Sequence, residues 1–147
     1  MSVVIRPIRS DERDAWQALW KGYQEYYETN LDDVTDSLWR RLMANNADGP
    51  HCFVAEDNAV LLGFVQYLYH GTTWSPQQRI YLHDLYTVPQ SRGKGIGRKL
   101  IEAVYQEGSK NNCDQVYWLT QDFNKDGRRL YDKVASLTPF IKYMQKV

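Results

Sequence analysis

Three glycines, each separated from the next by one residue, constrain the architecture of this chain most strongly. They are Gly93, Gly95 and Gly97, and they lie between an apolar segment, residues 80–88, and an amphipathic one. The first segment predicts a strand and the second a helix. A strand, a glycine turn and a helix in this order predict an anion-binding site. The turn brings backbone N–H groups close to a ligand, and the helix N-terminus carries a partial positive charge.

Four cations in or beside this turn favour a pyrophosphate on a larger cofactor as the anion. They are Arg92, Lys94, Arg98 and Lys99. The P-loop pattern is excluded, because Val88 stands where its first glycine belongs and Gly95 follows the lysine. The dinucleotide-binding pattern is excluded as well, since it needs Gly-x-Gly-x-x-Gly near an early strand, whereas this turn lies past the middle of the chain.

The residues of the turn resemble the acetyl-CoA motif of the GNAT superfamily of N-acetyltransferases, Arg/Gln-x-x-Gly-x-Gly/Ala. Arg92, Gly95 and Gly97 match it. Asn124, followed seven residues later by Tyr131, resembles the Asn-x-x-Ala-x-x-x-Tyr segment of the family. Within the superfamily, phrases in the middle of the chain are similar to diamine/spermidine-type acetyltransferases and to small yeast histone/polyamine acetyltransferases.

This resemblance implies a mixed α/β fold with a mostly antiparallel central sheet, helices on both faces and two parallel strands that splay apart around acetyl-CoA. The order of predicted elements favours the same class, because antiparallel strands come first and a strand–helix–strand–helix run follows. The resemblance also implies a homodimer. The chain departs from the family after Tyr131, where Asp132–Ser136 replaces the usual Lys-x-x-Gly-Phe, and at Gly127, which replaces an alanine.

Composition sets the broader limits. A length of 147 residues suits a single domain over residues 1–147. Eighteen basic and 18 acidic residues cancel, so no global charge favours nucleic acid. Cys52 and Cys113 lack the spacing of a zinc site, and no metal is expected. We find no apolar run long enough for a membrane span and no signal peptide, so we expect a cytoplasmic protein without membrane contact.

Hydrophobic periodicity predicts the elements in chain order. Strands are expected over residues 3–8, 52–55, 60–69, 80–88, 115–120 and 140–144. Helices are expected after an N-cap at Ser10, after an N-cap at Thr35 or Asp36, from the glycine turn to about residue 111, and over 124–135. Residues 70–78 are expected to form a loop.

The resemblance assigns the cofactor-binding residues. Backbone groups of the splayed strand would hold the pantetheine arm of acetyl-CoA, and the glycine turn would hold its pyrophosphate. The first group is Leu85, Tyr86 and Thr87, and the second is Arg92, Gly93, Lys94, Gly95, Ile96, Gly97 and Arg98. Asn124 is expected to cap a helix, to contact the pantetheine, or both.

Tyr131 is the expected acid, because the family places a tyrosine beside the sulfur of coenzyme A. A thiol has a pKa of about 8.5 and a tyrosine about 10. Donation to a finished thiolate is therefore uphill by roughly 2 kcal/mol, which is small against a chemical barrier. Late proton donation and simple hydrogen bonding to the sulfur both remain open, as does a purely structural core tyrosine.

His83 and Asp84 are the candidate bases. Adjacent side chains in a regular strand point to opposite faces, so one of them at most faces the substrate unless a bulge intervenes. His83 stands where polyamine-type relatives carry a glutamate, and it could act directly or through water. Asp84 could act as base, pair with a cationic substrate or serve as a structural hydrogen-bond acceptor.

The acceptor site is expected near the end of the first helix, where relatives line it with residues matching Tyr26, Tyr27 and Glu28. The acceptor is expected to be a small primary amine, a polyamine or an amino acid, which attacks the acetyl group directly. Two alternatives stay open. One is acetylation of a protein or histone-type lysine, and the other is a catalytically inactive module that binds coenzyme A.

Overall fold

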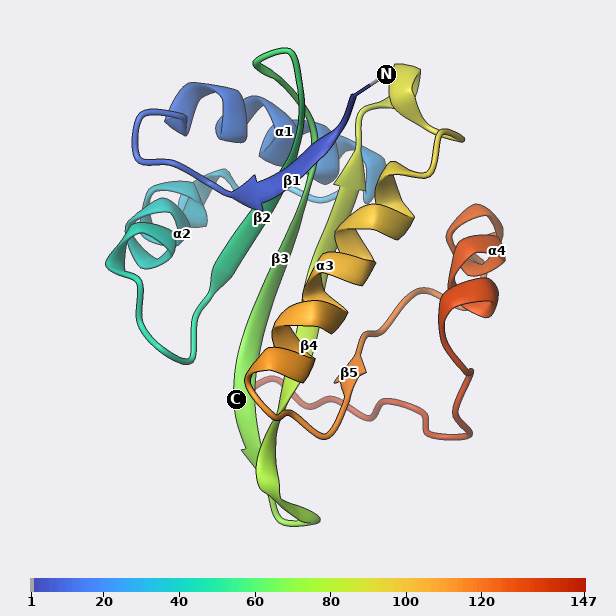
Figure 1. The fold of residues 1–147 in the computed structure, drawn as a ribbon. Helices are drawn as coiled ribbons and strands as arrows, with labels where there is room; N and C mark the ends of the chain where they lie inside the picture. Colours follow the sequence, from blue (N-terminus) through green and yellow to red (C-terminus); the bar gives the residue numbers. More distant parts are fainter. Residues whose placement is uncertain (1) are drawn as a thin grey trace.

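The computed structural model describes residues 2–147, which build one five-stranded sheet with the strand order β1-β2-β3-β4-β5 (Figure 1). The elements are β1 (Val4–Pro7), α1 (Arg13–Tyr26), α2 (Asp32–Ala44), β2 (His51–Asp57), β3 (Val60–Thr72), β4 (Ser75–Thr87), a 3₁₀ turn (Pro89–Ser91), α3 (Ile96–Lys110), β5 (Val116–Tyr117) and α4 (Lys125–Val134). All neighbouring strands are antiparallel except β4 and β5. The predicted mixed, mostly antiparallel sheet is therefore confirmed.

Helices cover both faces of this sheet, as predicted. On one face α1 and α2 pack tryptophans against the strands, and Trp16 is fully buried there. On the other face α3 lies along the strands and buries Leu100 and Val104 completely (Figure 1). In each helix the apolar side chains recur every three or four residues, so each helix presents one apolar stripe to the sheet.

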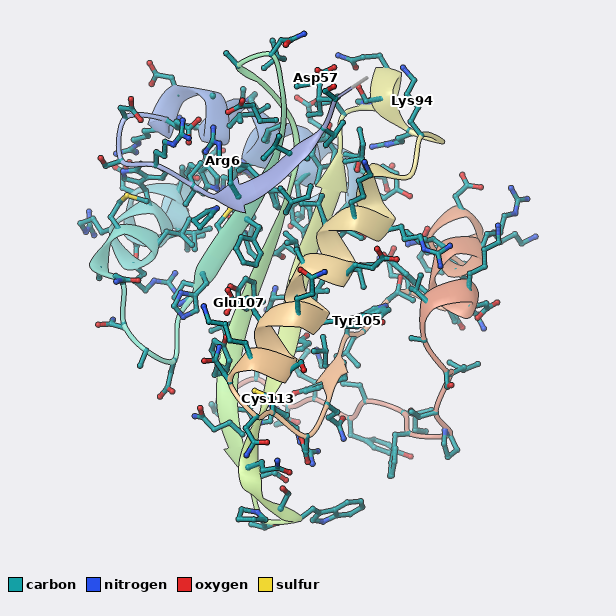
Figure 2. All side chains as sticks on the ribbon, in the orientation of Figure 1. Arg6, Asp57, Lys94, Tyr105, Glu107 and Cys113 are labelled. Atoms are coloured by element: carbon teal, nitrogen blue, oxygen red, sulfur yellow. The ribbon has the colours of Figure 1, made fainter. Side chains whose placement is uncertain are left out.

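The predicted helix starts are wrong in two places. The first helix begins at Arg13 rather than directly after Ser10. Arg6 and the backbone N–H of Arg9 bind the carboxylate of Glu12, which fixes the chain before the helix (Figure 2). The second helix begins at Asp32, so neither Thr35 nor Asp36 caps it.

The predicted loop over residues 70–78 is also wrong, because β3 and β4 run through it as a long hairpin. Thr72 pairs with Ser75, and the hydroxyl of Thr72 accepts a hydrogen bond of 3.2 Å from the N–H of Trp74. The register is irregular just beyond the turn, where Pro76 lies. A proline is tolerated at such an irregularity because its missing N–H is not needed for the ladder.

The strand predicted over residues 140–144 is absent, and the strand predicted over 115–120 shrinks to Val116–Tyr117. Two residue pairs join β5 to β4. Within residues 2–147 no other strand pairs with β5, and residues 140–144 join no ladder. Five large apolar side chains of the C-terminal segment are instead exposed, namely Leu137, Phe140, Ile141, Tyr143 and Met144.

A search of residues 2–147 for membrane-spanning helices finds none with the necessary length and apolarity. Within the same range no three His, Cys, Asp or Glu side chains form a group that could hold a metal ion. The two cysteines are free, and Cys52 is buried.

Candidate active site

A β-bulge at His83 brings the two candidate bases to the same face of the sheet. Gln66 pairs with Asp84, and the next residue on β3, Tyr67, pairs with Leu82, so His83 has no partner on β3. An extra residue of this kind interrupts the alternation of side chains. Nδ1 of His83 consequently lies 2.9 Å from Oδ1 of Asp84, on the face covered by α1.

Asp84 is buried and hydrogen-bonded through both carboxylate oxygens. Oδ1 accepts a bond of 2.6 Å from the hydroxyl of Tyr23 on α1, and Oδ2 accepts one of 2.8 Å from Nε2 of Gln66 on β3. Oε1 of Gln66 in turn accepts a bond of 2.9 Å from the indole N–H of Trp16. A buried carboxylate with this many donors is satisfied as an anion.

His83 differs from Asp84 in its access to solvent, since 53% of its side chain is exposed against 10% for the carboxylate. The hydrogen bond to Asp84 raises the pKa of His83 above its ordinary value, although partial burial opposes the shift. A raised pKa strengthens the imidazole as a proton acceptor near neutral pH. The pair therefore presents an accessible base supported by a buried anion.

The edge of β4 that follows the parallel pairing is open toward the last part of the chain. The pairing with β5 ends at Tyr81 and Tyr117, and the chain then leaves β4 and runs to α4 (Figure 1). Leu85 and Tyr86 face opposite sides of the sheet beside this open edge. This is the arrangement expected for a strand that offers backbone groups to an extended ligand.

The glycine turn has the backbone geometry of an anion cradle. Gly93 and Gly95 have φ angles of 77° and 80°, a region that side chains with a Cβ resist, and a Cβ at either would meet nothing within 4 Å. The backbone is therefore accessible from outside. Gly95 is the residue before α3, so the turn leads into the unpaired N–H groups of that helix. Figure 2 shows Lys94 on this turn, at the N-terminal end of α3.

The other residues of the predicted pyrophosphate site make contacts with protein groups outside the turn. Arg92 donates from Nε to the backbone oxygen of Thr87 at 2.9 Å. Arg98 pairs with Glu102 one turn later, at 2.9 Å. Ile96 is buried under the turn, and Gly97 allows close packing, because a Cβ there would lie 3.2 Å from Leu130.

Arg92 also connects the glycine turn to α1. Its guanidinium carbon lies 4.8 Å from the ring centre of Tyr26 and 5.6 Å from that of Tyr86. The hydroxyl of Tyr26 donates to Oδ1 of Asn124 at 3.3 Å. The same oxygen accepts from the N–H of Gly127, which confirms Asn124 as the N-cap of α4. The turn, the end of α1 and the start of α4 therefore meet at the open edge.

Tyr131 lies on α4 against the ring of Trp118, with 5.4 Å between ring centres. Burial raises the pKa of Tyr131 well above its ordinary value, and the proximity of Tyr27 and Tyr26 raises it further. The hydroxyl is therefore protonated at neutral pH and available as a donor. The structure thus brings Tyr26, Tyr27 and Tyr131 close together.

Glu28 differs from the other predicted substrate residues. It follows the end of α1 with a φ of 52° and is exposed. Sequence reasoning missed Tyr23 and Gln66 as members of the site, because Tyr23 falls on the apolar stripe of α1 and Gln66 within an apolar strand. The one available signal was Gln66 itself, since a polar side chain in a buried strand needs partners.

Comparison with known proteins gives a consistent assignment. The model of the acetyltransferase (GNAT) family matches residues 11–135. The chain is 33% identical over 153 residues to the D-amino-acid N-acetyltransferase HPA3 of Saccharomyces cerevisiae, covering 96% of this chain and 89% of that protein. It is 34% identical over 89 residues to the mouse thialysine N-epsilon-acetyltransferase, covering 55% of this chain and 52% of that protein.

Solved structures support the fold. The aminoglycoside acetyltransferase AAC(6')-Iy in complex with a bisubstrate analogue superposes with a TM-score of 0.85 at 18% identity, covering 100% of this chain and 99% of that one. Ribosomal-protein-alanine N-acetyltransferase from Brucella melitensis superposes with a TM-score of 0.81 at 18% identity, covering 99% and 100%. Given the glycine turn before α3, the open edge of β4 and these matches, the chain belongs to the acetyltransferase (GNAT) family and is an acetyl-CoA-dependent N-acetyltransferase.

Proposed function

We propose that this N-acetyltransferase acts on a small primary amine, a polyamine or an amino acid, and that His83 takes the proton from the acceptor. The observation that carries the proposal is the contact of 2.9 Å between the half-exposed imidazole and the buried carboxylate of Asp84. A primary ammonium has a pKa of about 10, so it needs a base at neutral pH. Asp84 is less suited to this role, because donors within the protein occupy both of its oxygens.

The names of two relatives support a small acceptor. The yeast relative is named for D-amino acids and the mouse relative for thialysine. The site is rich in tyrosines where the acceptor would enter, with the ring of Tyr26 lying 5.0 Å from that of Tyr27. Aromatic faces bind the alkyl chain and the cationic head of an amine. Tyr26, Tyr27 and the more distant Glu28 are therefore the proposed acceptor contacts.

The proposed cofactor contacts follow the geometry of the turn and strand. Gly93–Arg98 would bind the pyrophosphate of acetyl-CoA through backbone N–H groups, with Arg92 beside them. Leu85, Tyr86 and Thr87 would bind the pantetheine arm, and Asn124 would border it. The open space over Gly93 and Gly95 fits a phosphate, because nothing lies within 4 Å of a Cβ at either position.

Tyr131 is the proposed proton donor to the sulfur that leaves when the acetyl group is transferred. Its raised pKa keeps the proton on the hydroxyl in the resting enzyme, and it makes donation to a finished thiolate more uphill than for an ordinary tyrosine. The partial burial of Tyr131 offsets part of this cost, because a hydrogen bond to a developing anion is stronger in a less polar environment. In this proposal His83 takes the proton from the acceptor amine, and Tyr131 gives a proton to the leaving sulfur.

We further infer a cytoplasmic homodimer that comprises one catalytic domain per chain and binds neither nucleic acid nor membrane. The exposed apolar side chains at the C-terminus support self-association, because monomers rarely expose such groups together. Two free cysteines suit a reducing compartment. Equal numbers of acidic and basic residues give nucleic acid no overall attraction.

The test is an assay of thiol release from acetyl-CoA with polyamines, L- and D-amino acids, aminoglycosides and a histone-tail peptide as acceptors. We expect turnover on one class of small amine and a loss of about tenfold or more in kcat for Tyr131→Phe. Tyr105→Phe is the matched control, since it removes a hydroxyl that donates to the backbone of Val134. Binding of acetyl-CoA without turnover on any acceptor would refute the proposal.

A further inference from the structure

We infer that Tyr23 and Gln66 are positioning residues, which act through Asp84 to hold His83 with its proton on Nδ1 and its lone pair on Nε2. The two residues come from different elements, α1 and β3. The inference rests on the proposed role of His83 as base, but the position of the proton can be measured without any acceptor.

The direction of each hydrogen bond follows from Trp16. An indole nitrogen can only donate, so the atom of Gln66 that lies 2.9 Å from it must be the amide oxygen. The amide nitrogen of Gln66 therefore faces Asp84, at 2.8 Å from Oδ2. This nitrogen can only donate as well, which makes Oδ2 an acceptor and excludes a proton on it. A buried tryptophan thus fixes the orientation of the amide.

The second oxygen of Asp84 has two neighbours. The hydroxyl of Tyr23 lies 2.6 Å from Oδ1, and Nδ1 of His83 lies 2.9 Å from the same atom. Burial raises the pKa of Tyr23 far above its ordinary value, so this tyrosine stays protonated and donates. Because both oxygens of the carboxylate act as acceptors, the neutral imidazole must place its proton on Nδ1. Nε2 then carries the lone pair.

The surroundings of His83 contain few other charges. On its own strand Asp84 is the anion, and the ring of Tyr81 lies 5.1 Å away. Lys142, in the C-terminal segment, is a nearby cation, and its charge lowers the pKa of His83. This effect is smaller than the opposite effect of Asp84. Tyr27, the residue after α1, lies near Asp84 and is neutral, with a pKa that burial raises. Tyr117 of β5 stacks on Tyr81 and also has a raised pKa.

The hydroxyl of Tyr23 and the carboxylate of Asp84 have opposite effects on the basicity of His83, which gives the inference a sharp test. The hydroxyl of Tyr23 withdraws charge from the oxygen that His83 contacts. In Tyr23→Phe that oxygen becomes a better partner for the imidazolium, so the pKa of His83 should rise by about half a unit. In Asp84→Asn the anion is lost, so the pKa of His83 should fall.

The first measurement is nuclear magnetic resonance of the protein carrying isotope-labelled histidine. The chain contains three histidines, and His83→Gln assigns the signal of interest. We expect the neutral form of His83 to carry its proton on Nδ1, and the proportion of the Nε2–H form to increase in Asp84→Asn. An Nε2–H form in the unchanged protein would overturn the inference.

The second measurement is the pH dependence of kcat/KM on the best acceptor. We expect the acidic limb to move up in Tyr23→Phe, with the KM of acetyl-CoA unchanged, and to move down in Asp84→Asn, with a plateau reduced about tenfold or more. Tyr69→Phe is the matched control, because its hydroxyl bonds to Asn111 away from this face. Equal behaviour of Tyr23→Phe and Tyr69→Phe in titration and rate would reject the positioning role, whether or not the acceptor proposal holds.

Discussion

The hydroxyl of Tyr26 donates a hydrogen bond of 3.3 Å to Oδ1 of Asn124, a residue 98 positions later in the chain. The bond joins the last residue of α1 to the residue that caps α4. The guanidinium group of Arg92 lies over the ring of Tyr26. The rim of the open strand edge is therefore assembled from three segments that are distant in sequence. A change in any one of them should affect the binding of acetyl-CoA.

Asn124→Ala should weaken both the helix and the rim. Loss of the cap to Gly127 should lower the stability of the protein by about 1 kcal/mol, and loss of the contact with Tyr26 should raise the KM of acetyl-CoA. Thermal unfolding and steady-state kinetics measure the two effects. Asn30→Ala is the control, since Asn30 likewise accepts from a backbone N–H at a helix start, that of Asp32. An equal rise in KM for both variants would contradict the prediction.

Gly95→Ala should impair cofactor binding through the backbone alone. The φ of 80° at Gly95 costs a residue with a Cβ about 1 kcal/mol, so the turn should rearrange and the KM of acetyl-CoA should rise severalfold. Gly71→Ala is the matched control, because a Cβ there also meets nothing within 4 Å and its φ is ordinary. Calorimetric titration with coenzyme A measures the difference. Unchanged affinity in Gly95→Ala would show that the turn does not bind the phosphates.

The stability of the protein should fall on acidification through the ion pairs of Arg6. The hydrogen bond from Arg6 holds the pKa of Glu12 below its ordinary value of 4.5, so the stabilisation is complete above that pH and is lost as the pH falls through the lower folded value. Denaturant unfolding at a series of pH values should show this loss. The loss of stability on acidification should be smaller in Glu12→Gln. It should be unchanged in Asp11→Asn, because Asp11 has no ion pair in the described part of the chain.

Removal of residues 136–147 should convert the proposed dimer into a monomer. Phe140 and Ile141 are 74% and 77% exposed, and covering them would favour association. Sedimentation equilibrium of the shortened chain and of Phe140→Ser measures the change. Val60→Ser is the control, because Val60 is an exposed apolar residue at the start of β3, far from the C-terminus in sequence. A monomeric parent protein would refute the dimer directly.

Periodicity and the glycine spacing were sufficient to predict the sheet class, the layers and the strand–turn–helix unit. They could not locate the helix starts, because contacts from outside each helix help to set them: Arg6 of β1 binds Glu12, and the indole of Trp20 on α1 donates to Thr35. The strand predicted over residues 140–144 had the right composition, but the segment does not pair with the free edge of β5. Local propensity contains no information about that edge.

The site, like the fold, could be predicted only in part from the sequence. His83 and Asp84 were identified as candidates from their place in the predicted strand. In a regular strand, however, their side chains would point to opposite faces of the sheet. The bulge that unites them depends on the register between β3 and β4, which is set along the whole hairpin. Tyr23 could not be distinguished from its neighbours on α1, because its partner lies 61 residues away.

The order of the strands in the sheet, which equals their order in the chain, has a consequence for folding. The pairings of β2 with β3 and of β3 with β4 close tight hairpins, whereas the pairing of β1 with β2 spans α1 and α2 and the two residue pairs between β4 and β5 must wait for α3. The pairing of β4 with β5 thus combines a long connection with the fewest paired residues in the sheet. Amide hydrogens of Val116 and Tyr117 should therefore exchange with solvent much sooner than those of central β3, and coenzyme A should slow them selectively.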